Sequence, residues 1–398
     1  MELEYYFDPV KAERRKAYQR SGEGRLGSSV SIIENGNAFA PEAADVAIIG
    51  VEAGVNSPGN KGCSKAPDEV RDGLYELRGF DHGLKVADLG NIRGKTANDK
   101  LIALTDVCSF LIANSVIPIV IGGSQDLTVA LAAAAGRNIA DFNLSVIDSA
   151  IDYSGDTDDL TSVSFLSKLF SDNKERLGNI AMIGVQKYLY TSAEEEFIHR
   201  NYFDLIRLGE LKGESIKNAE PYLRDTDVLS LDVSSVKKTD MPAQPGAMPN
   251  GLISHEICQL AWYAGMSDRL KAFGMFELNP GEDDKSGSGV ALAAQILWHF
   301  MEGISLRHND YPVRDIDTYS IYIVHLEENG MDIRFFNNPQ NGRWWVEVPG
   351  DENRLIVSCS EDDYNNALKN ELSRRWIFFD KKSGSKSGIK DDSSTDID

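Results

Sequence analysis

The sequence has few cysteines, no long hydrophobic run and no excess of positive charge, and each absence excludes a class of protein. Cys63, Cys108, Cys258 and Cys359 are far apart and form no CxxC pair, which favours a reducing cytoplasm over a disulfide framework. No run of 18 apolar residues occurs, and the N-terminus lacks a basic region followed by an apolar core, so we expect neither a membrane span nor a signal peptide. A net charge of −21 argues against nucleic acid as a partner, because phosphates require basic surfaces.

What the sequence does contain is a regular alternation of apolar runs and amphipathic segments between residues 45 and 305. The expected strands are 45–51, 84–89, 117–121, 143–147, 180–184, 203–208, 227–233 and 272–278. The expected helices are 68–78, 99–114, 127–135, 163–177, 192–200, 253–263 and 290–304. This alternation predicts an α/β fold of three layers, α-β-α, around a mostly parallel sheet of about eight strands.

The two ends of the chain have a different character. The expected divisions are an N-terminal arm (1–40) with one short helix, a main domain (41–307), a C-terminal β-rich appendage (308–380) and a disordered tail (381–398). In the appendage, period-two alternation predicts strands at 319–325, 331–336 and 344–348. A polar amphipathic segment predicts one helix at 362–375. Its many aromatic residues imply packing within the chain, contact with another subunit, or binding of a protein partner.

Three of the expected strands end in clusters of polar residues: Gly122–Asp126, Asp148–Asp152 and Asp232–Ser234. Ligands of open parallel sheets bind beyond the carboxyl ends of the strands, so this edge is a candidate metal or catalytic site. Aspartate is also common as a cap of turns and helices, and that structural role is the alternative.

These three clusters resemble the metal-binding motifs of the ureohydrolase superfamily, which includes arginase, agmatinase and formiminoglutamase. Further segments, Asn60–Arg71, Pro242–Glu256 and Phe276–Pro280, resemble other motifs of the superfamily, in the right order. The resemblance covers roughly residues 45–305 and implies an arginase-like fold. It also implies two Mn²⁺ ions whose bound hydroxide attacks a guanidinium or formimino carbon.

The sequence departs from the superfamily pattern at three of its six metal-ligand positions. The substituted positions are Gln125 and Ala150, in place of histidines, and Ser234, in place of an aspartate; the retained ligands are Asp148, Asp152 and Asp232. One ion would keep its carboxylates with the Gln125 amide nearby, whereas the other loses a ligand at Ala150. The resemblance thus implies one divalent cation, Mn²⁺ or Mg²⁺, or none.

The expected catalytic groups are also incomplete. The resemblance assigns Glu277 to the carboxylate that faces the guanidinium, although a turn or helix-end contact is an alternative role for it. Asp159 aligns near the proton-shuttling histidine of the superfamily, and none of the six histidines falls on a catalytic motif. The remaining carboxylates repel one another, so a cation, a protonated acid or a lysine must compensate them. Lys237 and Lys238 stand where the superfamily has Asp-Pro, and their alternative role is that of solvated loop residues.

Three functional hypotheses follow. The first is a catalytically silent member of the superfamily, a pseudoenzyme that acts by binding or scaffolding. The second is a metal-dependent hydrolase of C–N bonds in a linear amidine that works with one remaining ion. The third is an unrelated binding module with an accidental motif match. We expect a cytoplasmic homo-oligomer without nucleic-acid or membrane partners, with the appendage as the surface for any protein partner.

Overall fold

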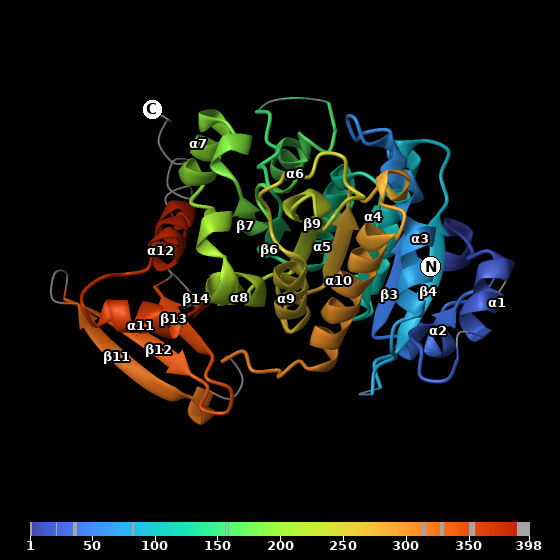
Figure 1. The fold of residues 1–398 in the computed structure, drawn as a ribbon. Coiled ribbons are helices and arrows are strands. Elements are labelled where there is room, and N and C mark those ends of the chain that lie inside the picture. The colour runs from blue at the N-terminus through green and yellow to red at the C-terminus, as the bar shows by residue number, and fades with distance from the viewer. Residues whose placement is uncertain are drawn as a thin grey trace, which may run out of the picture. The chain divides into compact units, whose positions relative to one another are not determined.

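The structure is a computed structural model, and it describes residues 2–20, 22–34, 38–81, 83–155, 157, 159–312, 316–326, 330–349 and 355–387. The chain divides into two units (Figure 1). The first unit comprises Met1–Glu195 and Leu205–Arg307, and the second comprises Glu196–Asp204 and His308–Asp398.

A mostly parallel sheet of ten strands forms the centre of the first unit. The strands are β1 (Phe7–Asp8), β2 (Ser31–Ile32), β3 (Val46–Gly50), β4 (Val86–Ile92), β5 (Ile117–Ile121), β6 (Phe142–Ile147), β7 (Leu177–Val185), β8 (Asp204–Arg207), β9 (Val228–Asp232) and β10 (Ala272–Phe276). They lie in the order β1-β4-β3-β5-β10-β9-β6-β7-β8, with β2 beside β4. The predicted fold class is confirmed, and the two strands beyond the expected eight are two-residue segments too short to leave a periodic pattern.

Helices pack in two groups, one on each face of this sheet. The first group is α3 (Ala66–Tyr75), α9 (Ser254–Gly265) and α10 (Ser288–Ser305), and the second is α4 (Ala97–Ala113), α5 (Thr128–Asn138) and α6 (Phe165–Asn173). The other α-helices before residue 307 are α1 (Ala12–Arg20), α2 (Leu26–Ser29), α7 (Ser192–Arg200) and α8 (Glu220–Arg224). In Figure 1, α9 and α10 lie in front of the sheet and α5 behind it. Strands β3, β5, β9 and β10 are buried at every residue, as expected for a parallel sheet covered on both faces.

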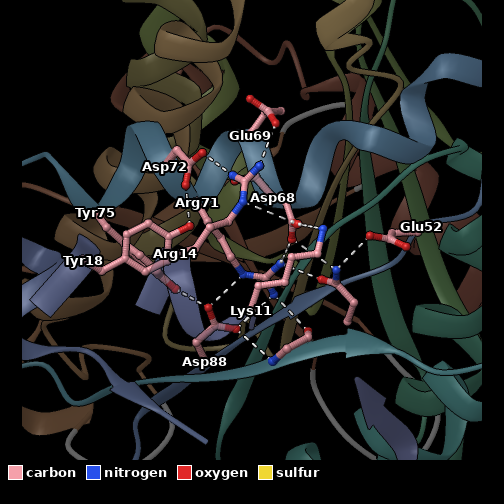
Figure 2. A network of polar contacts seen from close by, with 12 residues as sticks. Lys11, Arg14, Tyr18, Glu52, Asp68, Glu69, Arg71, Asp72, Tyr75 and Asp88 are labelled. Atoms are coloured by element: carbon pink, nitrogen blue, oxygen red, sulfur yellow. Dashed lines mark hydrogen bonds and ion pairs between the residues drawn. The ribbon is translucent and has the colours of Figure 1, made fainter. Parts of the chain in front are cut away.

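A buried ion pair joins α3 to β4, and Figure 2 shows the network around it. Arg71 is fully buried and donates from Nε and Nη2 to the two oxygens of Asp88, at 2.8 and 3.0 Å. The Tyr75 hydroxyl donates to the same carboxylate at 2.5 Å. Because a fork-like guanidinium matches a carboxylate in two parallel bonds, the pair fixes the helix to the strand in one orientation.

The N-terminal residues are not a loose arm, because they pair with the edge of the sheet. Strand β1 runs antiparallel to β4, with Phe7 opposite Ile92, and Arg14 of α1 forms ion pairs with Glu69 and Asp72 of α3. The approach is so close that a Cβ on Gly90, which has φ +90°, would lie 2.3 Å from the Asp8 carbonyl oxygen. The polar composition of residues 1–40 gives no sign of these contacts, because they are hydrogen bonds and ion pairs and leave no apolar pattern in the sequence.

The second unit contains a separate antiparallel sheet of four strands in the order β11-β12-β13-β14. Its elements are β11 (Ser320–Leu326), β12 (Met331–Asn337), β13 (Trp344–Val348), β14 (Leu355–Cys359), α11 (Glu361–Ala367) and α12 (Arg374–Ser387). Three strands were expected; β14 is the additional one. The single helix expected at 362–375 is wrong, because the chain forms two helices there.

The expected tail needs a second correction. Helix α12 continues to Ser387, so residues 381–387 are helical and not disordered. Residues 388–398 lie outside the described part of the chain. Phe335, Trp344, Trp376 and Phe379 are buried in a core of this unit's own, and Trp345 is fully buried as well. Ile321 and Ile323 of β11 remain 49% and 61% exposed.

No helix among the residues that the structure describes is long and apolar enough to cross a membrane.

Arg71→Ala should destabilise the protein by about 3–5 kcal/mol, because the variant leaves Asp88 buried without its cation. The matched control is Arg78→Ala, which breaks an ion pair with Asp81 whose two side chains are 70% and 68% exposed; we expect a change within about 0.5 kcal/mol there. Urea unfolding followed by circular dichroism measures both values. Equal effects of the two variants would contradict a structural role for the buried pair.

Candidate functional site

The predicted site residues follow four strands that are neighbours at the centre of the sheet, in the order β5-β10-β9-β6. Within this parallel ladder Phe276 pairs with Asp232, and Leu231 pairs with Ile147. Extending the register by one residue places Asp148 level with Asp232. Glu277 follows Phe276, the partner of Asp232, and so lies one residue further along the sheet edge. Parallel pairing therefore brings carboxylates from three distant parts of the sequence to one edge.

A cleft of about 550 Å³ opens at this edge. Its lining includes five acidic residues from the first unit: Asp148, Asp152, Glu194, Asp232 and Glu277. Ala150 and Ser234, two of the substituted ligand positions, also line it, whereas Gln125 does not. No lysine, arginine or histidine is found among the described lining residues. The cleft is therefore strongly acidic.

Two of the aspartates do form the turns that their alternative role predicts. Asp148 Oδ1 accepts a hydrogen bond from the Ala150 N–H at 3.1 Å, and Asp232 Oδ1 accepts one from the Ser234 N–H at 2.6 Å. Both are bonds from a side chain to the backbone two residues on, which is the usual aspartate turn. The turns use one oxygen of each carboxylate, so they account for these side chains only in part.

Burial and mutual repulsion make these carboxyl groups weak acids. Burial raises the pKa of Asp148 to about 6, and the Ala150 N–H limits the rise. Loss of solvent around Asp152 raises its pKa, and the charges of Asp148 and Asp232 raise it further. The pKa of Asp232 rises for the same reasons, with Asp148 and Glu277 as the repelling charges. All of these shifts favour the protonated form of the carboxyl groups.

Glu277 is the most fully bonded carboxylate of the cleft. Its Oε2 accepts hydrogen bonds from Ser57 Oγ at 2.6 Å and Asn60 Nδ2 at 2.8 Å, and its Oε1 accepts one from the Gln125 N–H at 3.0 Å. Burial raises its pKa, and these donors oppose the rise. Its backbone is left-handed, with φ 67°, a conformation that costs of order 1–3 kcal/mol in a residue other than glycine. The surrounding bonds hold this strained position.

The loop that carries Gln125 reaches the site because two backbones approach closely. A Cβ on Gly123 would lie 1.7 Å from the Ala53 carbonyl oxygen, so only glycine fits there. The Gln125 side chain is fully buried, and its Nε2 donates to Ser230 at 3.5 Å. The amide also lies near enough to lower the pKa of Asp148. Gln125 is therefore buried close to Asp148 without lining the cleft.

Three other residues named from the sequence do not act on the carboxylates. Lys237 forms an ion pair with Asp240, with Nζ 3.3 Å from its carboxylate. Lys238 Nζ donates to the Gln244 carbonyl at 2.8 Å. Asp159, at the position of the proton-shuttling histidine, is exposed and does not line the cleft. Compensation of the acids by a lysine is therefore wrong for these two side chains.

The sequence did not identify Ser57, Asn60 or Glu194 as site residues. Ser57 and Asn60 are 1% and 5% exposed and hold Glu277 across more than 200 residues of sequence. Asn60 was noted only as part of a motif, and Glu194 lies in an ordinary helical first turn. No pattern in the sequence marks contacts of such long range.

Comparison with known proteins identifies the family. The model of the arginase family matches residues 44–302, which is well over half of the chain. The chain belongs to the arginase family. Its fold is similar to that of formiminoglutamase from Trypanosoma cruzi crystallised with Mn²⁺ (TM-score 0.63, 24% identity, covering 71% of this chain and 99% of that one).

Two further solved structures share the arginase-family fold. They are formimidoylglutamase from Bacillus subtilis (TM-score 0.59, 17% identity, 69% of this chain and 97% of that one) and agmatine ureohydrolase from Thermoplasma volcanium (TM-score 0.58, 20% identity, 74% and 97%). No curated protein sequence matches the chain.

The residues present do not fit the two-ion centre that the resemblance implies. Ala150 has no donor atom, and Gln125 lies outside the cleft lining. Across the described ranges, no group of three or more histidine, cysteine, aspartate or glutamate side chains is arranged to hold a metal ion.

Asn60→Ala should destabilise the protein by about 2 kcal/mol. The change removes the amide that donates to the side chain and to the backbone carbonyl of Glu277, and it leaves these two acceptors buried without that donor. The control is Asn218→Ala, which removes one exposed bond of 3.3 Å and should change stability by less than about 0.5 kcal/mol. Thermal and urea unfolding give the values. A neutral Asn60→Ala would show that Glu277 is held by other contacts.

Proposed function

We propose that this arginase-family chain has lost its dinuclear metal centre and acts by binding or scaffolding, without hydrolysis. The single observation that carries the proposal is the cleft lining at Ala150. This residue stands where the resemblance expects a metal-binding histidine, and a methyl group offers nothing to an ion. The cleft nevertheless persists, with its acidic floor, and is large enough for a small molecule.

The state of the catalytic groups supports the same proposal. Asp159 stands near the expected position of the proton shuttle, but it is exposed and does not line the cleft. Glu277 is engaged by three donors from the protein itself. Hydrolysis of a C–N bond also requires an activated water, and the substituted ligand positions Gln125, Ala150 and Ser234 weaken the centre that would activate it.

The alternative function is hydrolysis of a linear amidine with one remaining ion, Mn²⁺ or Mg²⁺. It is favoured by the meeting of Asp148, Asp152 and Asp232 in one cleft. We rank it second because the imidazole ligand positions are substituted and the carboxylates take protons readily.

Elemental analysis of protein purified without chelator tests the proposal. We expect at most one divalent cation per chain, weakly held, and no urea or formamide from guanidino or formimino substrates. Formiminoglutamase from Trypanosoma cruzi, prepared in the same way, serves as the positive control. A stoichiometric pair of Mn²⁺ ions together with product release would contradict a silent protein.

Restoring the missing ligands tests the alignment of the strand ends. The triple variant Gln125→His, Ala150→His, Ser234→Asp should bind Mn²⁺ at least tenfold more tightly than the native chain, because it returns the expected ligands. Turnover need not return, since the variant still lacks the proton-shuttling histidine that the resemblance expects near Asp159. Calorimetric titration measures the affinity.

The control for the triple variant makes the same three changes at separate positions outside the cleft: Gln340→His, Ala97→His and Ser28→Asp. It should leave Mn²⁺ affinity unchanged. If both triple variants behave alike, the strand ends do not correspond to the superfamily's ligand positions.

A further inference from the structure

The acids of the cleft differ in how well the protein satisfies them. Glu277 accepts three hydrogen bonds, and Glu194 Oε2 accepts two from Thr191, both at 2.7 Å. Asp148 differs, because its Oδ2 is buried and no donor meets hydrogen-bond geometry there. The side chain is 1% exposed and lines the cleft. The acceptor atom without a hydrogen bond is therefore on Asp148 and not on Glu277.

The surroundings of Asp148 leave room for a ligand. Ala150 and Ser234 line the cleft beside it, and both are smaller than the side chains that the resemblance expects at those positions. Ser234 Oγ lies at 3.5 Å from Asp148 Oδ1, on the oxygen already bonded to the Ala150 N–H. Oδ2 is the oxygen of Asp148 without a hydrogen bond, although the Gln125 and Asp152 side chains lie close to this carboxylate, so it is the acceptor that a ligand's donor would satisfy.

We propose that the cleft binds the primary ammonium group of a small organic amine, with Asp148 Oδ2 as the main acceptor. This inference rests on the proposed function, since it requires the metal positions to be empty. An ammonium supplies both the positive charge that the acidic lining lacks and three N–H donors in a compact group. The aliphatic part of the amine meets the apolar lining residues Val163, Leu189 and Met248.

The geometry favours an ammonium over a guanidinium. A guanidinium gains its advantage from two parallel bonds to both oxygens of one carboxylate. At Asp148 one oxygen already serves the turn, and at Glu277 both oxygens accept bonds from the protein. A single-point donor loses nothing under these conditions, whereas a planar fork loses one of its bonds.

The binding experiment uses the full-length chain, freed of metal by chelator and dialysed into sodium phosphate at pH 7. Butylammonium chloride is titrated and followed by ligand-observed NMR. We expect saturable binding, at least tenfold tighter than that of tetramethylammonium, which has the charge without N–H donors, and of butanol, which lacks the charge. Butylguanidinium should bind more weakly than butylammonium.

Variants locate the bound ammonium. Asp148→Asn should weaken butylammonium binding at least tenfold while keeping the shape of the side chain. The matched control is Asp172→Asn, which removes the same charge from a half-exposed side chain of α6 and should change the affinity less than twofold. Ala150→Leu, which fills the space beside Asp148, gives a second test if Asp148→Asn does not fold.

Three results would overturn the inference. They are no butylammonium binding by the folded, metal-free chain, binding of tetramethylammonium within twofold, or loss of binding in Glu277→Gln but not in Asp148→Asn. The last result would place the cation at Glu277. None of these touches the proposed function, which fails only if the native protein takes up two Mn²⁺ ions and turns over substrate.

Discussion

The central constraint on this protein is that parallel strand pairing forces carboxylates together at one edge of the sheet. Register alone sets Asp148 level with Asp232, because Ile147 and Leu231 are partners in the ladder. A metal would normally cancel such a concentration of charge. Here the protein relies on turn N–H groups, on Ser57 and Asn60, and on raised pKa values that allow the acids to keep protons. The cleft retains an acidic floor as a result.

The fold could be predicted from the sequence wherever a segment is long and periodic. The strands at 117–121 and 143–147 and the helix at 192–200 are found within a residue of their expected limits, because uniform apolar runs and helical spacing leave little choice. Prediction failed where contacts are polar or segments short. Strand β1 is held by pairing with β4, and α1 beside it is held by the ion pairs of Arg14. In place of the helix expected at 362–375 the chain forms two helices, separated by residues 368–373.

The candidate site was predictable in its members but not in its bonding. Motif order alone brought Asp148, Asp152, Asp232 and Glu277 into one group, and the structure places all four in one cleft. It was not foreseeable that Glu277 accepts hydrogen bonds from residues more than 200 positions earlier, or that Gln125 does not line the cleft. Those facts depend on side-chain geometry across distant loops, which periodicity does not encode. Of the two roles considered for Lys237 and Lys238, compensation of the acids is not seen, since their partners are local residues of the loop.

The short antiparallel strand at the edge of the large sheet has a consequence for the chain's behaviour at high concentration. An exposed edge strand offers free N–H and C=O groups to any other strand and so invites association between molecules. Here β4 is covered by two-residue segments, and β1 is followed at once by Pro9, which has no N–H to donate. The N-terminal residues thus close the sheet, and a chain shortened past Pro9 would expose the Asn91–Ile92 end of β4, which β2 does not cover, to pairing with a neighbouring molecule.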